Sequence, residues 1–401
     1  MRSKSQSEFF KEITGFCPYP FQVSFFQTFF ANKDNLIVTA PTGSGKTWLA
    51  TFPFIYGKLL GQPFADRMFY VLPQRTLVTA VADTIRPNLE QFDLNVTVQM
   101  GGQGEDPLFE GDIIVTTIDQ LLSTYIGISY GSTRSSSNIA PGSLLGSYLV
   151  IDEFHLLETD KSLSTLIDLV FRLQPFVRFL MMTATAPQPL VSEIAKRTKS
   201  KCYRISSEEV TRLQQKANTL RERAITWIDT SVTAETVLSF HRDKTLVVVN
   251  TVEKVQNLFL ELKRIAKGKE GLNIVCLHAR FLPEDRTRKQ KQIKLWLGKE
   301  SIDETIVIGN QVVEVGLDVS ATVLITELCP ASSLIQRIGR CARYGETVGN
   351  VYVCDVDVNK RGTKSYLPYE KELVLQTRNY LEEHSPFRVT AVEEEKMVNF
   401  V

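Results

Sequence analysis

A glycine-containing loop at residues 40–47 carries the strongest chemical signal in the sequence. The loop, APTGSGKT, follows the apolar run LIVT and opens a segment expected to be helical. Its glycines would let the backbone turn several N–H groups toward phosphate oxygens. Lys46 could then reach the β- and γ-phosphates, and Thr47 could hold a magnesium ion. The residues expected to bind ATP in this loop are Thr42, Gly43, Ser44, Gly45, Lys46 and Thr47.

Two adjacent carboxylates end another apolar run, SYLVIDEFH, at residues 147–155. Carboxylates at the end of a buried strand are costly to desolvate unless a partner or an ion pairs with them. In a phosphate-loop fold, a second strand end must bring a carboxylate to the magnesium ion. Asp152 would bind that ion, directly or through water, and Glu153 would polarise the water that attacks the γ-phosphate. A metalloprotease site is excluded, because it needs two histidines on one face of a helix.

Three further polar side chains follow apolar runs. His155 lies just beyond the two carboxylates and could sense the γ-phosphate. The alternative for His155 is a histidine at the start of a helix with only a local hydrogen bond. Thr183 and Thr185, in TAT, follow the run RFLMM and would place two hydroxyls near a cleft between domains. Simple strand propensity also explains these threonines.

The second half of the chain contains a basic segment, SLIQRIGRCARYG, at residues 333–345. Spacings of four and three residues place Gln336, Arg340 and Arg343 on one face of a predicted helix. Two arginines supplied across a cleft could neutralise the charge that develops on the γ-phosphate. The alternative is an ordinary solvated basic face of a helix.

A turn-rich stretch, GNQVVEVGLDVSA, precedes this segment at residues 309–321. It predicts a loop, a short helix and a turn that carry Glu314, Gly316 and Asp318. These residues are placed to contact the ribose of a nucleotide or the backbone of a substrate. Gly316 and Asp318 are therefore included among the expected ATP-binding residues.

Short apolar runs that alternate with turn residues and amphipathic segments must position these side chains. Such alternation predicts parallel sheets flanked by helices, hence the α/β class. The runs are NLIVTAP, RMFYVLP, DIIVTT, YLVIDE and RFLMMTAT, and then KTLVVVN, NIVCLHA, TIVIGN, ATVLITEL and NVYVCDV. A charged stretch at 206–223 separates the two sets. We expect one domain at 1–215, a second at 216–356, and a short helical C-terminal tail at 357–401.

The amino-acid composition limits the class of protein and the compartment to be expected. The chain has 401 residues and 43% hydrophobic content, so it can bury a large core, while a net charge of +1 restricts any nucleic-acid site to a local groove. No apolar stretch is long enough to span a membrane, and the polar start lacks a signal peptide. Six scattered cysteines and four histidines form no pattern of metal ligands, so a reducing cytoplasm without a structural metal is expected.

The motifs APTGSGKT, DEFH, TAT and QRIGRCAR, in this order, resemble those of a superfamily-two DExH helicase. The DEFH box and residues 310–345 are most similar to the CRISPR-associated helicase of type I interference systems. The resemblance covers about residues 18–356 and implies two tandem RecA-like domains. It also implies ATP and magnesium as cofactors.

The resemblance further implies roles for individual residues. Gln22, in YPFQ, would read the adenine edge. His155, Thr183 and Thr185 would couple hydrolysis to domain movement, and Arg340 and Arg343 would act as arginine fingers. Contacts to the backbone of a nucleic-acid strand would come from Arg75, Thr116, Thr117, Asn250, Thr251, His278 and Arg280.

The expected function is ATP-driven, 3′-to-5′ translocation on single-stranded DNA in CRISPR type I interference. The usual family member carries a histidine–aspartate nuclease domain before the helicase, whereas Gln22 lies almost at the start of this sequence. A separate nuclease subunit and a surveillance complex with guide RNA are therefore the expected partners. The alternatives are an RNA helicase or DNA-repair translocase of the same superfamily, and an ATP-gated nucleic-acid clamp that does not step.

Overall fold

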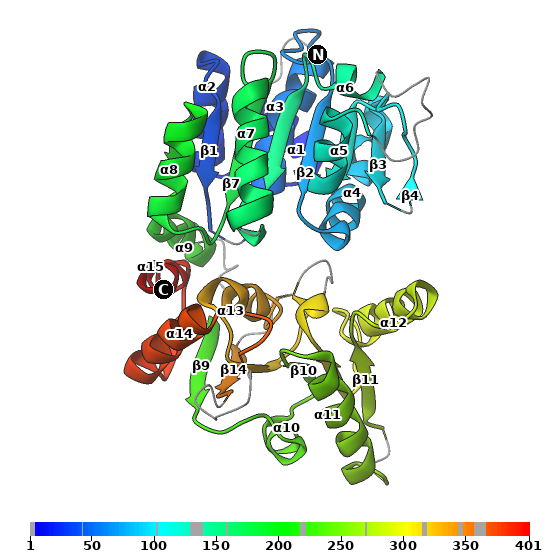
Figure 1. Ribbon diagram of the computed structural model, residues 1–401, viewed down its shortest axis with the longest axis vertical. Helices are drawn as coiled ribbons and strands as arrows, with labels where there is room; N and C mark the ends of the chain where they lie inside the picture. The colour runs from blue at the N-terminus through cyan, green and yellow to red at the C-terminus, as the bar shows by residue number, and fades with distance from the viewer. Residues whose placement is uncertain are drawn as a thin grey trace. The chain divides into compact units, whose positions relative to one another are not determined.

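The computed structural model describes residues 5–41, 43–101, 103–128, 139–157, 159–216, 222–268, 271–314, 319–343, 348–356 and 366–401. The chain divides into two compact units, Met1–Val210 and Thr211–Val401. Each unit contains one sheet with helices packed on it (Figure 1). None of the described helices is both long enough and apolar enough to cross a bilayer.

The first unit is built on an eight-stranded sheet. Its strands are β1 (Leu36–Thr39), β2 (Met68–Leu72), β3 (Val96–Met100), β4 (Gln103–Gly104), β5 (Ile113–Thr117), β6 (Tyr148–Asp152), β7 (Arg178–Thr183) and β8 (Lys201–Arg204). Their order is β4-β3-β5-β2-β6-β7-β1-β8, and only β4 pairs antiparallel. Every residue of β2, β5 and β6 is buried. Helices cover both faces of a parallel sheet, which is why these central strands are continuous apolar runs.

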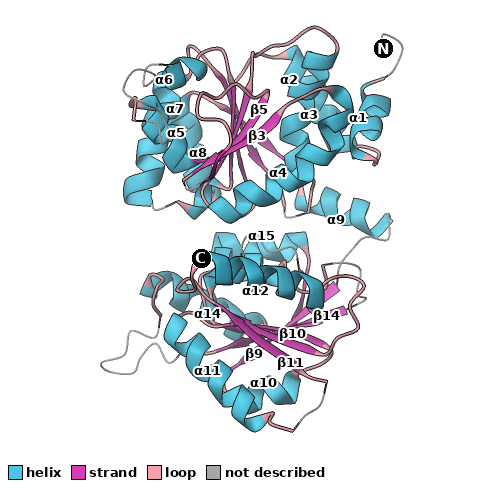
Figure 2. Ribbon diagram, turned by 90° about the vertical axis from the view of Figure 1, so that its right-hand side faces the viewer, coloured by secondary structure: helices cyan, strands magenta, loops and turns pink. Residues whose placement is uncertain are grey.

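The helices of the first unit form two layers. They are α1 (Gln6–Thr14), α2 (Pro20–Ala31), α3 (Lys46–Leu59), α4 (Arg75–Leu89), α5 (Ile118–Tyr125), α6 (Ile139–Ser143), α7 (Ser164–Leu173) and α8 (Gln188–Thr198), with short turns at Glu90–Phe92, Phe154–Leu156 and Thr159–Leu163. Figure 2 shows α1 to α3 on one side of the sheet and α5 to α8 on the other. Aromatic side chains fill the first layer; the ring centroids of Phe26 and Phe52 lie 4.6 Å apart. Aliphatic side chains such as Leu121 and Leu166 fill the second.

The second unit is built on a seven-stranded sheet. Its strands are β9 (Glu222–Ile228), β10 (Lys244–Val248), β11 (Asn273–Leu277), β12 (Thr305–Gly309), β13 (Val323–Glu327), β14 (Val348–Cys354) and β15 (Phe387–Val389). Their order is β11-β12-β10-β13-β14-β9-β15, and only β15 pairs antiparallel. The helices are α9 (Ser207–Lys216), which spans the boundary in the chain, α10 (Ala234–Phe240), α11 (Val252–Ile265), α12 (Pro283–Trp296), α13 (Ala331–Ile338), α14 (Lys371–His384) and α15 (Ala391–Phe400), with a turn at Gln311–Val313.

Alternate residues along the strands of the second sheet pack into two separate hydrophobic cores. Leu246 and Val248 point into a core with α12, α13, α14 and α15. Val247 points to the opposite face and packs with α10 and α11. This alternation follows from the period of two residues along a strand. The helices and strand of residues 366–401 thus contribute to the same core as the rest of the second unit.

The predicted α/β class with parallel sheets flanked by helices is confirmed, and all ten predicted apolar runs form strands. The sequence did not predict β3, β4, β8, β9 or β15. Two of these misses have a clear cause. β8 is an edge strand with largely exposed residues, so it lacks an apolar pattern. β9 begins with charged residues inside the stretch that was expected to link the domains.

Candidate ATP site and a buried arginine network

The phosphate loop joins β1 to α3 and depends on two glycines. Gly43 has φ 74° and Gly45 has φ 76°, a left-handed conformation that is costly for residues with a Cβ. Ser44 is buried, and its hydroxyl donates to the carbonyl of Pro41 at 2.7 Å. Lys46 is the first residue of α3. The loop therefore has the backbone shape that a phosphate-binding turn at a helix N-terminus requires.

Lys46 links this loop to the carboxylates at the end of β6. Its side chain is buried, and Nζ donates to the carbonyl of Ala40 at 3.3 Å. The same atom lies 3.6 Å from Oε1 of Glu153. The structure thus brings together the cation predicted to bind phosphate and the carboxylate predicted to activate water.

Asp152 is held in place from two sides. The hydroxyl of Tyr70 donates to Oδ2 at 2.6 Å, and the backbone N–H of Glu153 donates to Oδ1 at 2.9 Å. Burial, and then the negative charge of Asp152, raises the pKa of Tyr70, so this hydroxyl stays protonated as the donor. Burial, and next the charge of Glu153, raises the pKa of Asp152. A cation beside Asp152 would favour its ionised form.

Glu153 has an unusual backbone conformation and a carboxylate oxygen that is not hydrogen-bonded to the described residues. Its φ of 53° places a non-glycine residue in the left-handed region, a strain that often marks a functional position. Burial alone would raise the pKa of Glu153, but the Lys46 ammonium lowers it below its usual range. Among the described residues, Oε2 is buried and makes no hydrogen bond, although Nδ1 of His155 lies 3.4 Å away. An ionised carboxylate with one unused acceptor is suited to bind and polarise a water molecule.

The donor set fits magnesium. Thr47 is the second residue of α3, next to Lys46, and Tyr70 interacts with both Thr47 and Asp152. A threonine hydroxyl, a carboxylate and phosphate oxygens are the hard ligands that Mg²⁺ prefers. Thr47 and Asp152 would therefore hold the ion together with ATP.

His155 and Thr183 are in direct contact. Nδ1 of His155 lies 2.9 Å from Oγ1 of Thr183 and 3.4 Å from Oε2 of Glu153. Burial lowers the pKa of His155, so the ring is neutral at pH 7. Thr183 Oγ1 also accepts from the backbone N–H of Thr185 and of Ala186. The loop after β7 is thereby bonded to His155, which lies next to the glutamate of the ATP site.

Gln22 lies in α2 and contacts the phosphate loop. It is the third residue of α2, and its Oε1 accepts from the backbone N–H of Tyr19 at 2.9 Å. Its Nε2 lies 3.4 Å from the carbonyl of Gly45. The structure places Gln22 beside the ATP site, and its contact with adenine stays a prediction.

The helix predicted over 333–345 is wrong beyond Ile338, where α13 ends. After Gly339 the backbone instead pairs with Ala321, whose N–H donates to the carbonyl of Arg340 at 3.0 Å. Glycine weakens the helix, and this pairing turns the chain away from its axis. Gln336, Arg340 and Arg343 therefore do not share a helical face.

Both arginines are nevertheless anchored. The guanidinium of Arg340 donates from Nε and Nη2 to the carbonyl of Glu314, at 3.1 and 2.8 Å. The backbone N–H of Arg343 donates to the hydroxyl of Ser320 at 2.7 Å. Their action on ATP stays a prediction.

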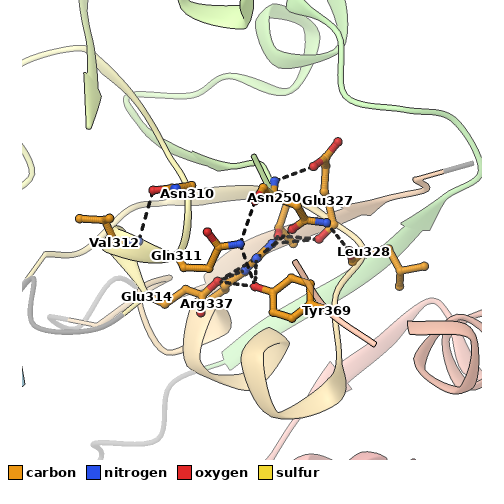
Figure 3. A network of polar contacts seen from close by, with 10 residues as sticks. Asn250, Asn310, Gln311, Val312, Glu314, Glu327, Leu328, Arg337 and Tyr369 are labelled. Atoms are coloured by element: carbon orange, nitrogen blue, oxygen red, sulfur yellow. Dashed lines mark hydrogen bonds and ion pairs between the residues drawn. The ribbon is translucent and has the colours of Figure 1, made fainter. Parts of the chain in front are cut away.

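Sequence reasoning missed Arg337, which is the centre of a buried network (Figure 3). Its guanidinium is 0% exposed and forms an ion pair with Glu314 at 2.7 Å. It also donates to Thr326 Oγ1 at 2.7 Å, to Asn250 Oδ1 at 3.0 Å and to the Tyr369 hydroxyl at 2.8 Å. The sequence contains one signal for this burial: Arg337 follows Leu334 by three residues, a spacing that places it on the apolar face of α13.

The predicted nucleic-acid residues of the first unit differ in their surroundings. Arg75 is exposed at the start of α4 and lies against Gly101, where an added Cβ would be 2.6 Å from its Nη2. Thr116 is buried and donates to the carbonyl of Gln99 at 2.6 Å. Thr117 caps α5, because its hydroxyl oxygen accepts from the backbone N–H of Gln120 at 3.4 Å. Arg75 has the exposure that a phosphate contact requires, and Gly101 is a neighbour that sequence reasoning did not identify.

The predicted nucleic-acid residues of the second unit also differ from one another in their surroundings. Asn250 is buried: its Nδ2 donates to the carbonyl of Leu328 at 2.9 Å, and its Oδ1 accepts from Arg337. Thr251 caps α11. His278 stacks on Phe281, with ring centroids 4.1 Å apart, and Arg280 is exposed. The side chain of Asn250 is thus engaged within the protein, whereas Arg280 faces solvent.

Thr42, Gly316 and Asp318 lie outside the described residues. In the part of the chain that the structure describes, no three or more histidine, cysteine, aspartate or glutamate side chains form a group that could hold a metal ion.

Comparison with known proteins bears on both units. Residues 19–194 match the family model of the DEAD/DEAH box helicase, and residues 241–346 match that of the CRISPR-associated nuclease/helicase Cas3, C-terminal. The CRISPR-associated helicase Cas3 of Thermoproteus tenax is 28% identical over 365 residues, which cover 86% of this chain and 59% of that protein.

Solved structures show the same fold. The crystal structure of T. fusca Cas3 superposes with a TM-score of 0.75 at 19% identity, covering 97% of this chain and 52% of that one. A chain of a CRISPR RNA-guided surveillance complex, pre-nicking, gives a TM-score of 0.69 at 21% identity, with 95% and 50% coverage. The chain thus spans about half the length of the proteins in these structures.

These findings confirm the predicted resemblance to a superfamily-two helicase that is Cas3-like. The two tandem RecA-like domains are confirmed by the fold. The helicase match and the Cas3 relatives support an ATP-hydrolysing helicase.

Proposed function

We propose that this Cas3-like helicase hydrolyses ATP to move 3′-to-5′ along single-stranded DNA in CRISPR type I interference. The observation that carries the proposal is the juxtaposition of Lys46 and Glu153, 3.6 Å apart, beside a phosphate loop with two left-handed glycines. Lys46 would bind the β- and γ-phosphates. Glu153, with its unused acceptor, would orient and polarise the attacking water.

The remaining residues of the first unit have supporting roles in this proposal. Thr47 and Asp152 would hold magnesium, which neutralises phosphate charge when bound. Tyr70 would keep the Asp152 carboxylate in place through its hydrogen bond. His155 contacts Thr183 and lies 3.4 Å from Glu153, so a change at the γ-phosphate that moves Glu153 would also move the loop after β7.

Arg340 and Arg343 would act when ATP draws the two units into a closed state. Their guanidinium groups would neutralise charge on the γ-phosphate in the transition state. Arg75 and Arg280 would contact strand phosphates, with Thr116, Thr117, Thr251 and His278 shaping the path; such contacts bind with little regard to sequence.

The names of the relatives support the biological setting. The T. tenax protein is named a CRISPR-associated helicase, and one structural match is a surveillance complex. We therefore propose a surveillance complex with guide RNA as partner. We also propose that the nuclease acts from another subunit. The alternatives remain an RNA helicase or DNA-repair translocase of this superfamily, and a clamp that does not step.

Steady-state ATP hydrolysis with single-stranded DNA, single-stranded RNA or no polynucleotide tests the proposal. We expect strong stimulation by DNA and loss of turnover in Lys46→Ala. Stimulation by RNA alone would favour the RNA helicase. Hydrolysis that no polynucleotide changes would contradict a nucleic-acid motor.

A further inference from the structure

Tyr369 completes the buried network around Arg337, although it lies outside the helicase motifs. It precedes α14, beyond the region 241–346 that matches the Cas3 family model. Its hydroxyl accepts from Arg337 Nη2 at 2.8 Å and from Gln311 Nε2 at 3.3 Å, and it donates to Glu314 Oε1 at 3.1 Å (Figure 3). One donor and two acceptors are all that a tyrosine hydroxyl offers, so this hydroxyl is fully used.

The partners of Tyr369 lead to residues assigned to function. Glu314 carries the backbone carbonyl that receives both hydrogen bonds from the Arg340 guanidinium. Gln311 also donates from Nε2 to the carbonyl of Asn250 at 2.9 Å. Tyr369 thus joins the segment that anchors Arg340 to the turn that precedes Thr251.

Packing does not account for the hydroxyl. The ring of Tyr369 packs against the core of α13 and α14, and a phenylalanine would fill that space equally well. Burial raises the pKa of the hydroxyl, so it stays protonated and remains a donor to Glu314. Its three bonds constrain Glu314 and Gln311 relative to the guanidinium of Arg337, which is itself buried and paired.

We propose that Tyr369 is a positioning residue, whose hydroxyl holds Glu314 so that Arg340 is presented correctly to the γ-phosphate of ATP. This inference rests on the proposed ATP-driven function. The second arm of the network, through Gln311 to Asn250, reaches the predicted nucleic-acid contacts. Loss of the Tyr369 hydroxyl should therefore slow DNA-stimulated ATP hydrolysis more than basal ATP hydrolysis.

Tyr369→Phe tests the proposal, because it removes one oxygen and keeps the ring. We expect DNA-stimulated kcat to fall about tenfold, a loss on the scale of one hydrogen bond to a charged group, while the KM for ATP changes less than about twofold. The matched control is Tyr366→Phe. Within the described part of the chain, the Tyr366 hydroxyl makes no hydrogen bond, and its ring packs on the same core. Tyr366→Phe should match the wild type.

A double-mutant cycle with Arg340→Ala separates positioning from general loosening. If Tyr369 acts through Arg340, Tyr369→Phe should lower kcat less than about twofold further in the Arg340→Ala background. A variant that merely loosens the second unit would lower kcat by the same factor in both backgrounds. Additive losses would therefore overturn the positioning role.

Failure of the proposed function and failure of the role of Tyr369 would give different results. Wild-type protein without ATP hydrolysis would overturn the proposed function and, with it, the role of Tyr369. Hydrolysis that requires Lys46 but is equal in Tyr369→Phe and Tyr366→Phe would overturn the role of Tyr369 alone.

Discussion

At the scale of single residues, the ATP site combines a strained glutamate with a lysine that keeps it ionised. Glu153 lies in the left-handed region, and its Oε1 is 3.6 Å from Lys46 Nζ. Tyr70 and the N–H of Glu153 together fix both oxygens of Asp152. Neighbouring carboxylates thus have different environments, which suits one to hold a cation and the other to activate water.

Glu153→Gln tests this division of roles. The amide keeps the size of the side chain but is a far weaker base. ATP should still bind, whereas single-turnover hydrolysis should slow by about 10²–10⁴-fold, the range of general base catalysis. Lys46→Ala is the companion variant and should lose ATP affinity, because it removes the phosphate contact. Near-normal turnover in Glu153→Gln would show that another group activates the water.

Gly45→Ala tests the shape of the loop, with Gly15→Ala as its matched control. Both glycines have φ 76°, so each alanine should cost about 1 kcal/mol of stability. A Cβ at Gly45 would also lie 2.9 Å from Gln22 Nε2, whereas one at Gly15 meets nothing within 4 Å. The Kd for ATP should rise about tenfold in Gly45→Ala only, because a shift of about 1.4 kcal/mol is tenfold in affinity. Equal ATP affinity in the two variants, measured by titration calorimetry, would contradict the assigned loop.

At the scale of elements, Arg337 ties α13 to β13, to Glu314 directly after the Gln311–Val313 turn, and to the segment before α14. Removing one partner of a buried ion pair leaves an uncompensated charge and costs about 3–5 kcal/mol. Arg337→Met should therefore lower the free energy of unfolding by that amount in urea titrations. Glu314→Gln added to Arg337→Met should restore part of the loss, because no unpaired charge remains.

Arg388→Met is the control for that experiment. Arg388 pairs with Glu222 at 2.8 Å between β15 and β9, but its side chain is 74% exposed. Exposed pairs contribute about 0–1 kcal/mol, so this variant should unfold almost like the wild type. Similar losses in Arg337→Met and Arg388→Met would mean that the network does not hold these elements together.

Buried strands were predictable and irregular backbone was not. Runs such as YLVID are apolar throughout because helices cover both faces, so the sequence shows them clearly. β8 has no such pattern, since it is an exposed edge. The path after Ile338 depends on pairing with Ala321, which lies 17 or more residues earlier and leaves no local signal. Arg337 was missed because an arginine is expected at the surface unless its buried partner is known.

The ATP site was more predictable than the network for a related reason. Its loop and its DEFH carboxylates are local motifs, and parallel strands bring their carboxyl ends to one edge of a sheet. The hydrogen bonds of Tyr369 join residues 32 to 58 positions apart in the chain, and those of Asn250 join residues 61 to 87 positions apart. No spacing in the sequence encodes such contacts.

At the scale of the whole molecule, the ATP residues belong to the first unit and the arginine network to the second. The proposed function therefore requires both units and a nucleic-acid strand. With a net charge of +1, the chain offers no general attraction for DNA, so binding must come from local contacts such as Arg75 and Arg280.

Unwinding of tailed duplexes tests the central claim most directly. Purified chain is incubated with magnesium, ATP and a labelled duplex that carries a single-stranded 3′ or 5′ tail, and the products are separated on native and denaturing gels. Wild-type protein should separate the 3′-tailed duplex in the presence of ATP and leave both strands uncut, while Lys46→Ala should separate neither substrate. A preference for the 5′ tail would contradict the proposed direction, and failure to separate either duplex although ATP is hydrolysed would contradict translocation on DNA.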